Sequence, residues 1–321
     1  MILFKNVCLT PLMVFMALTS ISLTNIMMIW FVMEINNFMF IALMMISMKE
    51  KKMIFLYFIV QIISSTLMII SLTFNPLLVG MMSQLLMFIS LLIKTGIPPF
   101  HLWMPMMASS LSWMTIFFLC TIQKIIPLAI FNLFIMSKIM IVTVIIMTLI
   151  VPSVTMINLK NFKKLILYSS INQSGWMIIL IFLSHPFWMM YMLMYSMIML
   201  MMCILLNMTK LSNLYFQYSL KKFNATFTLM MMNIASMPPF SFFLFKWTTT
   251  FLIIMNSNMN FIMISMLINS LIMTYIYINM MSWSLFTNQF KSKMKLSSTK
   301  LKLIESSMII IILLIPLMIL L

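Results

Sequence analysis

The chain has 321 residues, of which 64% are hydrophobic and 7% are charged. Soluble domains contain about 25% charged residues, so this composition excludes an ordinary water-soluble globular protein. All 19 basic residues are lysines, the three acids are Glu34, Glu50 and Glu305, and the net charge is +16. A large positive charge is also found in proteins that bind nucleic acids, so the positions of the lysines must decide what this charge means.

Apolar stretches separated by Lys, Asn, Ser or Pro clusters predict an all-α polytopic membrane protein with about eleven spanning helices, in a single domain over residues 1–321. The apolar N-terminal run resembles a signal peptide, but the apolar spans that follow it favour a first membrane helix. The fourth and ninth stretches are too long for one span and contain Pro-Pro, so we expect both to be broken. The stretches are 7–24, 26–47, 53–74, 77–109, 112–136, 139–158, 166–184, 187–208, 226–255, 259–283 and 306–321.

The lysines outside these stretches test the number of helices. If the helices alternate in direction, fifteen lysines lie on one side of the membrane and only Lys138 lies on the other. Short loops on the cytoplasm-like side carry an excess of positive charge, so this bias supports eleven spans with the N-terminus on the positive side. The charge therefore reflects topology, and we expect no nucleic-acid partner. The fifteen are Lys5, Lys49, Lys51, Lys52, Lys160, Lys163, Lys164, Lys210, Lys221, Lys222, Lys291, Lys293, Lys295, Lys300 and Lys302.

Four ionisable residues fall inside predicted spans: the acid Glu34 and the lysines Lys94, Lys124 and Lys246. An ionised side chain at the centre of a membrane costs about 2.5–3.5 kcal/mol on insertion scales. A lysine near a helix end can instead extend to the interface. That alternative fits the central Lys124 poorly and the short side chain of Glu34 even less. These residues are therefore the candidates for function.

A buried lysine beside a carboxylate can bind and release protons. Desolvation favours the neutral amine, a nearby carboxylate favours the ammonium, and a guanidinium would stay charged. We therefore expect Glu34 to control the protonation of Lys94. Polar residues at helical spacing accompany these groups, and they either line a hydrated path or join helices by hydrogen bonds. They are Ser83 and Ser90 with Lys94, then Gln61, Ser64 and Ser65, and then Ser169, Asn172 and Gln173.

Two segments combine a lysine with Pro-Pro-Phe. Residues 94–103 read Lys-Thr-Gly-Ile-Pro-Pro-Phe-His-Leu-Trp, and residues 237–247 read Met-Pro-Pro-Phe-Ser-Phe-Phe-Leu-Phe-Lys-Trp. The two Pro-Pro-Phe motifs are 140 residues apart, and the lysine precedes the prolines in one segment and follows them in the other. Broken helices at matching positions of inverted repeats indicate the ion site of a transporter. The alternative is a pair of unrelated proline kinks.

His101 follows the first break and is a further candidate for a proton relay, with a structural histidine as the alternative. The sequence has no Gly-rich nucleotide loop, no cysteine cluster and no Ser/His/Asp set. We therefore expect no redox cofactor, no metal site and no hydrolytic site in this chain.

Several motifs, in the same order, resemble those of the subunit 2 family of mitochondrial NADH dehydrogenase, which lies in the membrane arm of respiratory complex I. Residues 30–36 are similar to the family's Trp-x-x-x-Glu-x-Asn, and residues 94–103 to its Lys-x-Gly-x-x-Pro-Phe-His-x-Trp. Three further segments match, namely Gln123-Lys124-Ile-Ile-Pro127, the run from Asn158 to Gly175-Trp176, and Lys246-Trp247.

The chain also departs from this family at four places, and at the first of them Thr121-Ile122 replaces the tryptophan before Gln123. Gln173 stands where many relatives have a histidine, and Phe245 replaces a proline. Ser236-Met237 replaces glycines before Pro238.

The resemblance implies an antiporter-like, proton-translocating subunit of the mitochondrial inner membrane with its N-terminus in the matrix. It implies that Glu34 and Lys94 form a pair, that Lys124 is the central relay and that Lys246 is the exit-side group. NADH, FMN, iron–sulfur clusters and ubiquinone would be bound by partner subunits. The expected partners are other membrane-arm and accessory subunits of complex I and the lipids of the inner membrane. A free-standing cation/proton antiporter and a structural scaffold without its own proton path are the alternatives.

Overall fold

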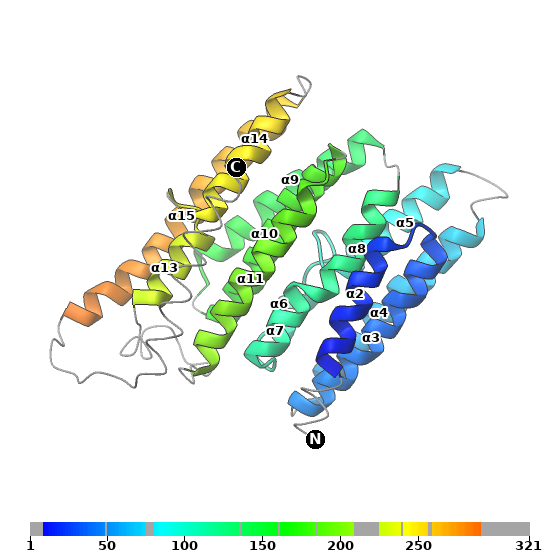
Figure 1. Cartoon of the computed structure of the whole chain (residues 1–321), viewed down its shortest axis with the longest axis horizontal. Coiled ribbons are helices and arrows are strands. Elements are labelled where there is room, and N and C mark those ends of the chain that lie inside the picture. The colour runs from blue at the N-terminus through cyan, green and yellow to red at the C-terminus, as the bar shows by residue number, and fades with distance from the viewer. Residues whose placement is uncertain are drawn as a thin grey trace.

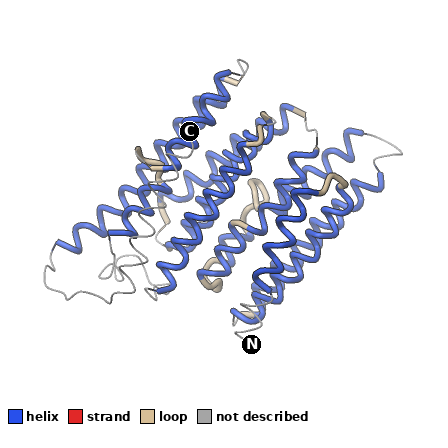
Figure 2. Tube along the Cα trace, viewed as in Figure 1, coloured by secondary structure: helices blue, strands red, loops and turns tan. Residues whose placement is uncertain are grey.

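The computed structural model describes residues 9–48, 50–74, 80–134, 137–159, 161–183, 185–208, 225–238, 240–255 and 259–289. Within these ranges the regular structure consists of thirteen helices, with no strand (Figure 2). The helices are α2 (Thr10–Ser22), α3 (Ile26–Ser47), α4 (Lys51–Phe74), α5 (Gly80–Thr95), α6 (Trp103–Met107), α7 (Trp113–Cys120), α8 (Ile122–Leu133), α9 (Lys138–Ile157), α10 (Phe162–Phe182), α11 (Phe187–Met208), α13 (Ala225–Ile234), α14 (Ser241–Met255) and α15 (Asn260–Gln289).

The helices follow the predicted apolar stretches. Seven segments of the described chain are long and apolar enough to cross a membrane, and α7 and α8 together form one of them. With α2, the α5–α6 pair and the α13–α14 pair, ten of the eleven predicted spans have a helical counterpart. The eleventh, residues 306–321, lies outside the described residues. The prediction of an all-α membrane protein is confirmed.

The helices lie side by side along a common direction (Figure 1). Helices α2 to α5 form one side of the molecule, α13 to α15 form the other, and α9 to α11 lie between them. Helix α10 is the most enclosed of the candidate spans, because 94% of its 18-residue apolar segment is buried within the protein. Because α10 is enclosed by other helices, its polar residues can serve contacts within the protein.

Both predicted breaks are present, and the first begins at Gly96. This residue has a φ of +65°, a conformation that glycine adopts without a steric penalty. The Gly96 N–H donates to the Ile93 carbonyl (3.2 Å), and the Ile97 N–H donates to the Leu92 carbonyl (3.0 Å). These two bonds form a Schellman motif, which ends a helix and satisfies its last carbonyls. The prolines at 98 and 99 then prevent α5 from continuing.

The second break repeats this backbone geometry 140 residues later. Ser236 takes the place of the glycine and has a φ of +57°. Its N–H donates to the Asn233 carbonyl (2.8 Å), and the Met237 N–H donates to the Met232 carbonyl (3.2 Å). The two Pro-Pro-Phe segments therefore follow the same helix-ending motif. Unrelated proline kinks would not be expected to share the same two backbone hydrogen bonds and the positive φ, so the match favours related breaks.

A third interruption was not expected from the sequence. The predicted helix 112–136 is divided at Thr121, where φ is −115° and ψ is −77°, into α7 and α8. The Thr121 hydroxyl donates to the Phe117 carbonyl (2.7 Å) and holds the end of α7 in place. Further along, Pro127 lacks the N–H that would bond to the Gln123 carbonyl. Lys124 therefore lies in the first turn of a separate helical segment.

Candidate functional site

Glu34 on α3 and Lys94 on α5 form an ion pair in the interior. The Lys94 Nζ lies 2.6 Å from the Glu34 Oε1, and the side chains are 2% and 18% exposed, respectively. It is the single salt bridge within the described part of the chain. A charge buried in a membrane protein usually has such a partner. The lysine is enclosed, whereas the side chain of Glu34 is partly exposed.

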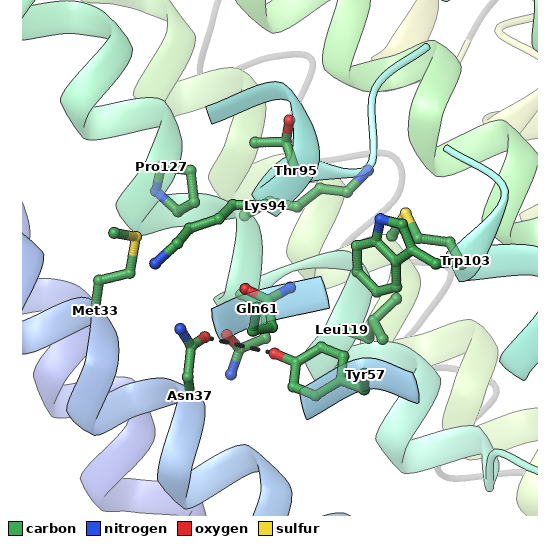
Figure 3. A pocket seen from close by; sticks show the side chains of 12 residues that line it. Met33, Asn37, Tyr57, Gln61, Lys94, Thr95, Trp103, Leu119 and Pro127 are labelled. Atoms are coloured by element: carbon green, nitrogen blue, oxygen red, sulfur yellow. Dashed lines mark hydrogen bonds between the residues drawn. The ribbon is translucent and has the colours of Figure 1, made fainter. Parts of the chain in front are cut away.

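A cavity lies next to this ion pair and extends to a second lysine. Lys94 and Lys124 both line it, and its volume of about 10 Å³ has room for about one water molecule. In Figure 3, Asn37, Gln61 and Tyr57 gather on the side of the cavity opposite Thr95. The lining comes from α3, α4, α5, α7 and α8 and from the segment after the first break. It consists of Met33, Asn37, Tyr57, Gln61, Lys94, Thr95, Trp103, Met104, Leu119, Gln123, Lys124 and Pro127.

The tyrosine and amide side chains that line this cavity make only long hydrogen bonds among the described residues. The Tyr57 hydroxyl donates to the Asn37 Oδ1 at 3.5 Å (Figure 3), and the Gln123 Nε2 donates to the Asn36 carbonyl at 3.4 Å. The Nδ2 atoms of Asn36 and Asn37 are buried and have no hydrogen-bond partner among the described residues. Polar cavities of this kind bind ordered water in proteins. The space between Lys94 and Lys124 is therefore suited to a water molecule.

Lys124 connects this cavity to the central helix α10. Its Nζ donates to the Ser170 carbonyl (2.9 Å) and to the Ser170 Oγ (3.2 Å). The lysine is buried, and no acid pairs with it within the described residues. A buried amine held by neutral oxygens can lose its proton and remain solvated by the protein.

Lys246 on α14 contacts α10 from the other side of the molecule. Its Nζ donates to the Ser236 Oγ at 2.7 Å and lies 5.3 Å from the centre of the Trp176 ring. The face of a tryptophan ring attracts a cation. Ser170 and Trp176 are six positions apart on α10, which corresponds to about 9 Å along the helix axis. Helix α10 therefore connects the surroundings of Lys124 with those of Lys246.

A continuous group of buried polar residues on α10 accompanies these two contacts. Gln173 accepts a hydrogen bond from the Tyr191 hydroxyl of α11, and the Asn172 Oδ1 accepts one from the Asn269 Nδ2 of α15 at 2.6 Å. For Asn172 and Gln173, these contacts support the interpretation that the polar residues join helices by hydrogen bonds. The buried polar residues of α10 are Ser169, Ser170, Asn172, Gln173 and Ser174.

Comparisons with known proteins identify the family. Residues 22–274 match the family model described as NADH:quinone oxidoreductase/Mrp antiporter, TM. The chain is 34% identical over 304 residues to NADH-ubiquinone oxidoreductase chain 2 of Rhipicephalus sanguineus, with 93% of this chain and 96% of that one covered. It is 31% identical to the protein of the same name from Anopheles gambiae, over 86% of this chain and 84% of that one. The chain belongs to the NADH-ubiquinone oxidoreductase chain 2 family.

Solved structures show the same fold at low sequence identity. A chain of respiratory complex I from Thermus thermophilus with bound aureothin superposes with a TM-score of 0.74 at 15% identity, over 90% of this chain and 72% of that one. A chain of the Mrp complex from Dietzia sp. DQ12-45-1b superposes with a TM-score of 0.73 at 13% identity, over 84% and 59%. Each of these neighbours is a subunit of a multi-subunit assembly.

The structure places three of the four main candidates of this family member close together and the fourth at a distance. Glu34, Lys94 and Lys124 surround or adjoin one cavity, whereas Lys246 reaches them only through α10. His101 is buried after the first break and packs beside Tyr168, with 6.1 Å between the ring centres. No described hydrogen bond links it to one of the three lysines, and its role in a relay stays a prediction.

Among the described lysines outside the predicted stretches, Lys163 alone is buried. Lys163 was expected in a loop, but it lies in the first turn of α10 and is buried. Its Nζ donates to the Leu111 carbonyl at 2.6 Å and lies 5.4 Å from the centre of the Trp113 ring. The burial of Lys163 has no signal in the sequence, because a hydropathy pattern does not show the Leu111 carbonyl that accepts from its ammonium.

Proposed function

We propose that this chain is a proton-translocating membrane subunit of a respiratory NADH:ubiquinone oxidoreductase. In this proposal Glu34 and Lys94 exchange a proton with Lys124 across the shared cavity. From Lys124 the proton passes along the polar side of α10 to Lys246. Quinone reduction, which drives the movement, takes place in other subunits of the complex.

The cavity that Lys94 and Lys124 both line is the main support for this function. A protein that served only as a scaffold would have no need to bury three lysines, since each charged group at membrane depth costs about 2.5–3.5 kcal/mol. The amines also suit the task, because they can be held in either protonation state whereas a guanidinium cannot. The two matching helix breaks are the arrangement expected around a transported ion.

Membership in complex I is supported by the relatives that carry that name at 31–34% identity over most of their length. We infer that the partners are other subunits of the membrane arm and inner-membrane lipids, and that NADH, FMN, iron–sulfur clusters and ubiquinone are bound elsewhere in the complex. We place the chain in the mitochondrial inner membrane with its N-terminus in the matrix, because short loops facing that side carry the excess lysines.

Replacement of Lys124 tests this function. Lys124→Met keeps the apolar stem and removes the amine, so the assembled complex, reconstituted in vesicles, should translocate fewer protons per NADH oxidised. Lys138→Met is the matched control, because Lys138 is exposed at the start of α9. An unchanged proton yield in an assembled Lys124→Met complex would reject the relay and favour a scaffold.

A further inference from the structure

We propose that Ser236 is the positioning residue for Lys246, with its hydroxyl as the acceptor that holds the ammonium for proton transfer. This inference rests on the proposed function, because it assigns a partner to one of the four groups of the relay. It concerns the second helix break, where no carboxylate of the described residues takes the role that Glu34 has at the first.

Ser236 occupies a backbone position that is suited to glycine. The segments Gly96-Ile-Pro-Pro-Phe100 and Ser236-Met-Pro-Pro-Phe240 have the same helix-ending bonds, and both begin with a positive φ. Serine rarely adopts this conformation, because its Cβ approaches the following carbonyl oxygen. Strained backbone conformations of this kind are concentrated at functional sites, so the side chain of Ser236 is a candidate for a role there.

The hydrogen bonds of Ser236 fix the direction in which its hydroxyl points. The Oγ donates its proton to the Ala235 carbonyl at 2.6 Å. A hydroxyl has one proton and two lone pairs, so towards Lys246, 2.7 Å away, it can only accept. The backbone of the break therefore sets the Ser236 oxygen as an acceptor for the protonated amine.

No other described oxygen lies within hydrogen-bonding distance of the Lys246 Nζ. Glu34 pairs with Lys94, Glu50 is exposed, and Glu305 lies outside the described residues. The Trp176 ring adds attraction for the cation, but its face offers no lone pair that would fix the direction of an N–H bond as the Ser236 oxygen does. The two halves of the chain thus hold their break-associated lysines differently, with a carboxylate in the first and a hydroxyl in the second.

Three variants of the assembled complex, reconstituted in vesicles, test this assignment. Ser236→Gly removes the acceptor and suits a φ of +57°, so we expect normal assembly on native gels. Its proton transfer through this chain should fall about tenfold, because a hydrogen bond to a charged group is lost. Ser236→Asn tolerates a positive φ and offers an amide oxygen, so it should recover most of the loss. Lys246→Met sets the value for complete removal of the amine.

The outcomes separate the two proposals. If Ser236→Gly translocates protons like the unmodified complex while Lys246→Met does not, the role of Ser236 is rejected and the proposed function stands. A loss in Ser236→Gly that Ser236→Asn fails to reverse in an assembled complex also rejects it. If Lys246→Met itself retains the full proton yield, the relay through Lys246 is rejected together with the role of Ser236.

Discussion

Individual residues in this chain carry their charges in three different environments. Lys94 has a carboxylate partner, Lys124 has a serine carbonyl and hydroxyl, and Lys246 has a hydroxyl and an aromatic face. The proton affinity of each amine depends on these neighbours, because desolvation favours the neutral amine whereas a nearby negative charge favours the ammonium. In the proposed relay, these non-equivalent amines would pass a proton when one neighbour, such as Glu34, approaches or recedes.

Lys163 provides a prediction about stability. Lys163→Met should destabilise the chain by about 1.5–3 kcal/mol, because the Leu111 carbonyl loses a charged donor and the contact with Trp113 is lost. The measurement is the thermal unfolding of the purified complex, detected on native gels as the loss of this subunit with rising temperature. Lys164→Met is the control, since Lys164 is only partly buried. Equal effects of the two variants would show that the Leu111 contact contributes nothing.

The ionisable residues of the site were predictable, but their neutral partners were not. Glu34, Lys94, Lys124 and Lys246 stand out because charge is rare inside apolar stretches. Ser236 does not, because serine is common in membrane helices and its role depends on a backbone angle. Its one signal in the sequence is its replacement of a glycine at the position that matches Gly96.

At the scale of helices, α10 depends on close packing against α9. A Cβ added at Gly175 would lie 2.5 Å from the Thr148 Oγ1 on α9, a distance at which one of the two helices must shift. Small residues at such positions let membrane helices approach each other. The same helix carries Ser170 and Trp176, so a shift of α10 would disturb the surroundings of both Lys124 and Lys246.

This packing predicts a loss of stability in one variant that a second substitution should partly reverse. Gly175→Ala should lower stability by about 1–3 kcal/mol through overpacking, and the double variant Gly175→Ala/Thr148→Ala should recover part of the loss because the Oγ1 is absent. The midpoint of thermal unfolding of the complex is the measurement. If the double variant unfolds at a lower temperature than Gly175→Ala alone, the contact does not explain the effect.

The helices themselves follow from the sequence better than their interruptions do. Long apolar runs predict eleven stretches, of which the ten within the described residues are helical, and Pro-Pro predicts two of the breaks, because proline removes a backbone donor. The division at Thr121 has no comparable signal, since a threonine whose hydroxyl bonds to its own helix is common. The division depends on contacts between helices. It lies next to Lys124, whose Nζ donates to the Ser170 carbonyl of α10.

Across the whole molecule, the ionisable groups run from α3, through α5 and α8, to α14. These helices are far apart in the sequence, and α3 and α14 lie in different parts of the bundle (Figure 1). The sequence predicts which helices carry charge but not that α10 connects them, because its polar residues show only helical spacing. The connection depends on long-range contacts such as those of Ser170 with Lys124 and of Trp176 with Lys246.

The direct test of this account is the number of protons translocated per NADH oxidised by an assembled complex with Glu34→Gln. The amide fills the same space but cannot take up the charge that balances Lys94, so we predict a clear loss. Glu50→Gln is the control, because Glu50 is exposed. Loss of its partner leaves Lys94 as a buried unpaired charge, which can prevent assembly. In that case the double variant Glu34→Gln/Lys94→Met removes both charges. It should assemble and translocate fewer protons per NADH oxidised than the unmodified complex. A proton yield equal to that of the unmodified complex, in either assembled variant, would contradict the relay.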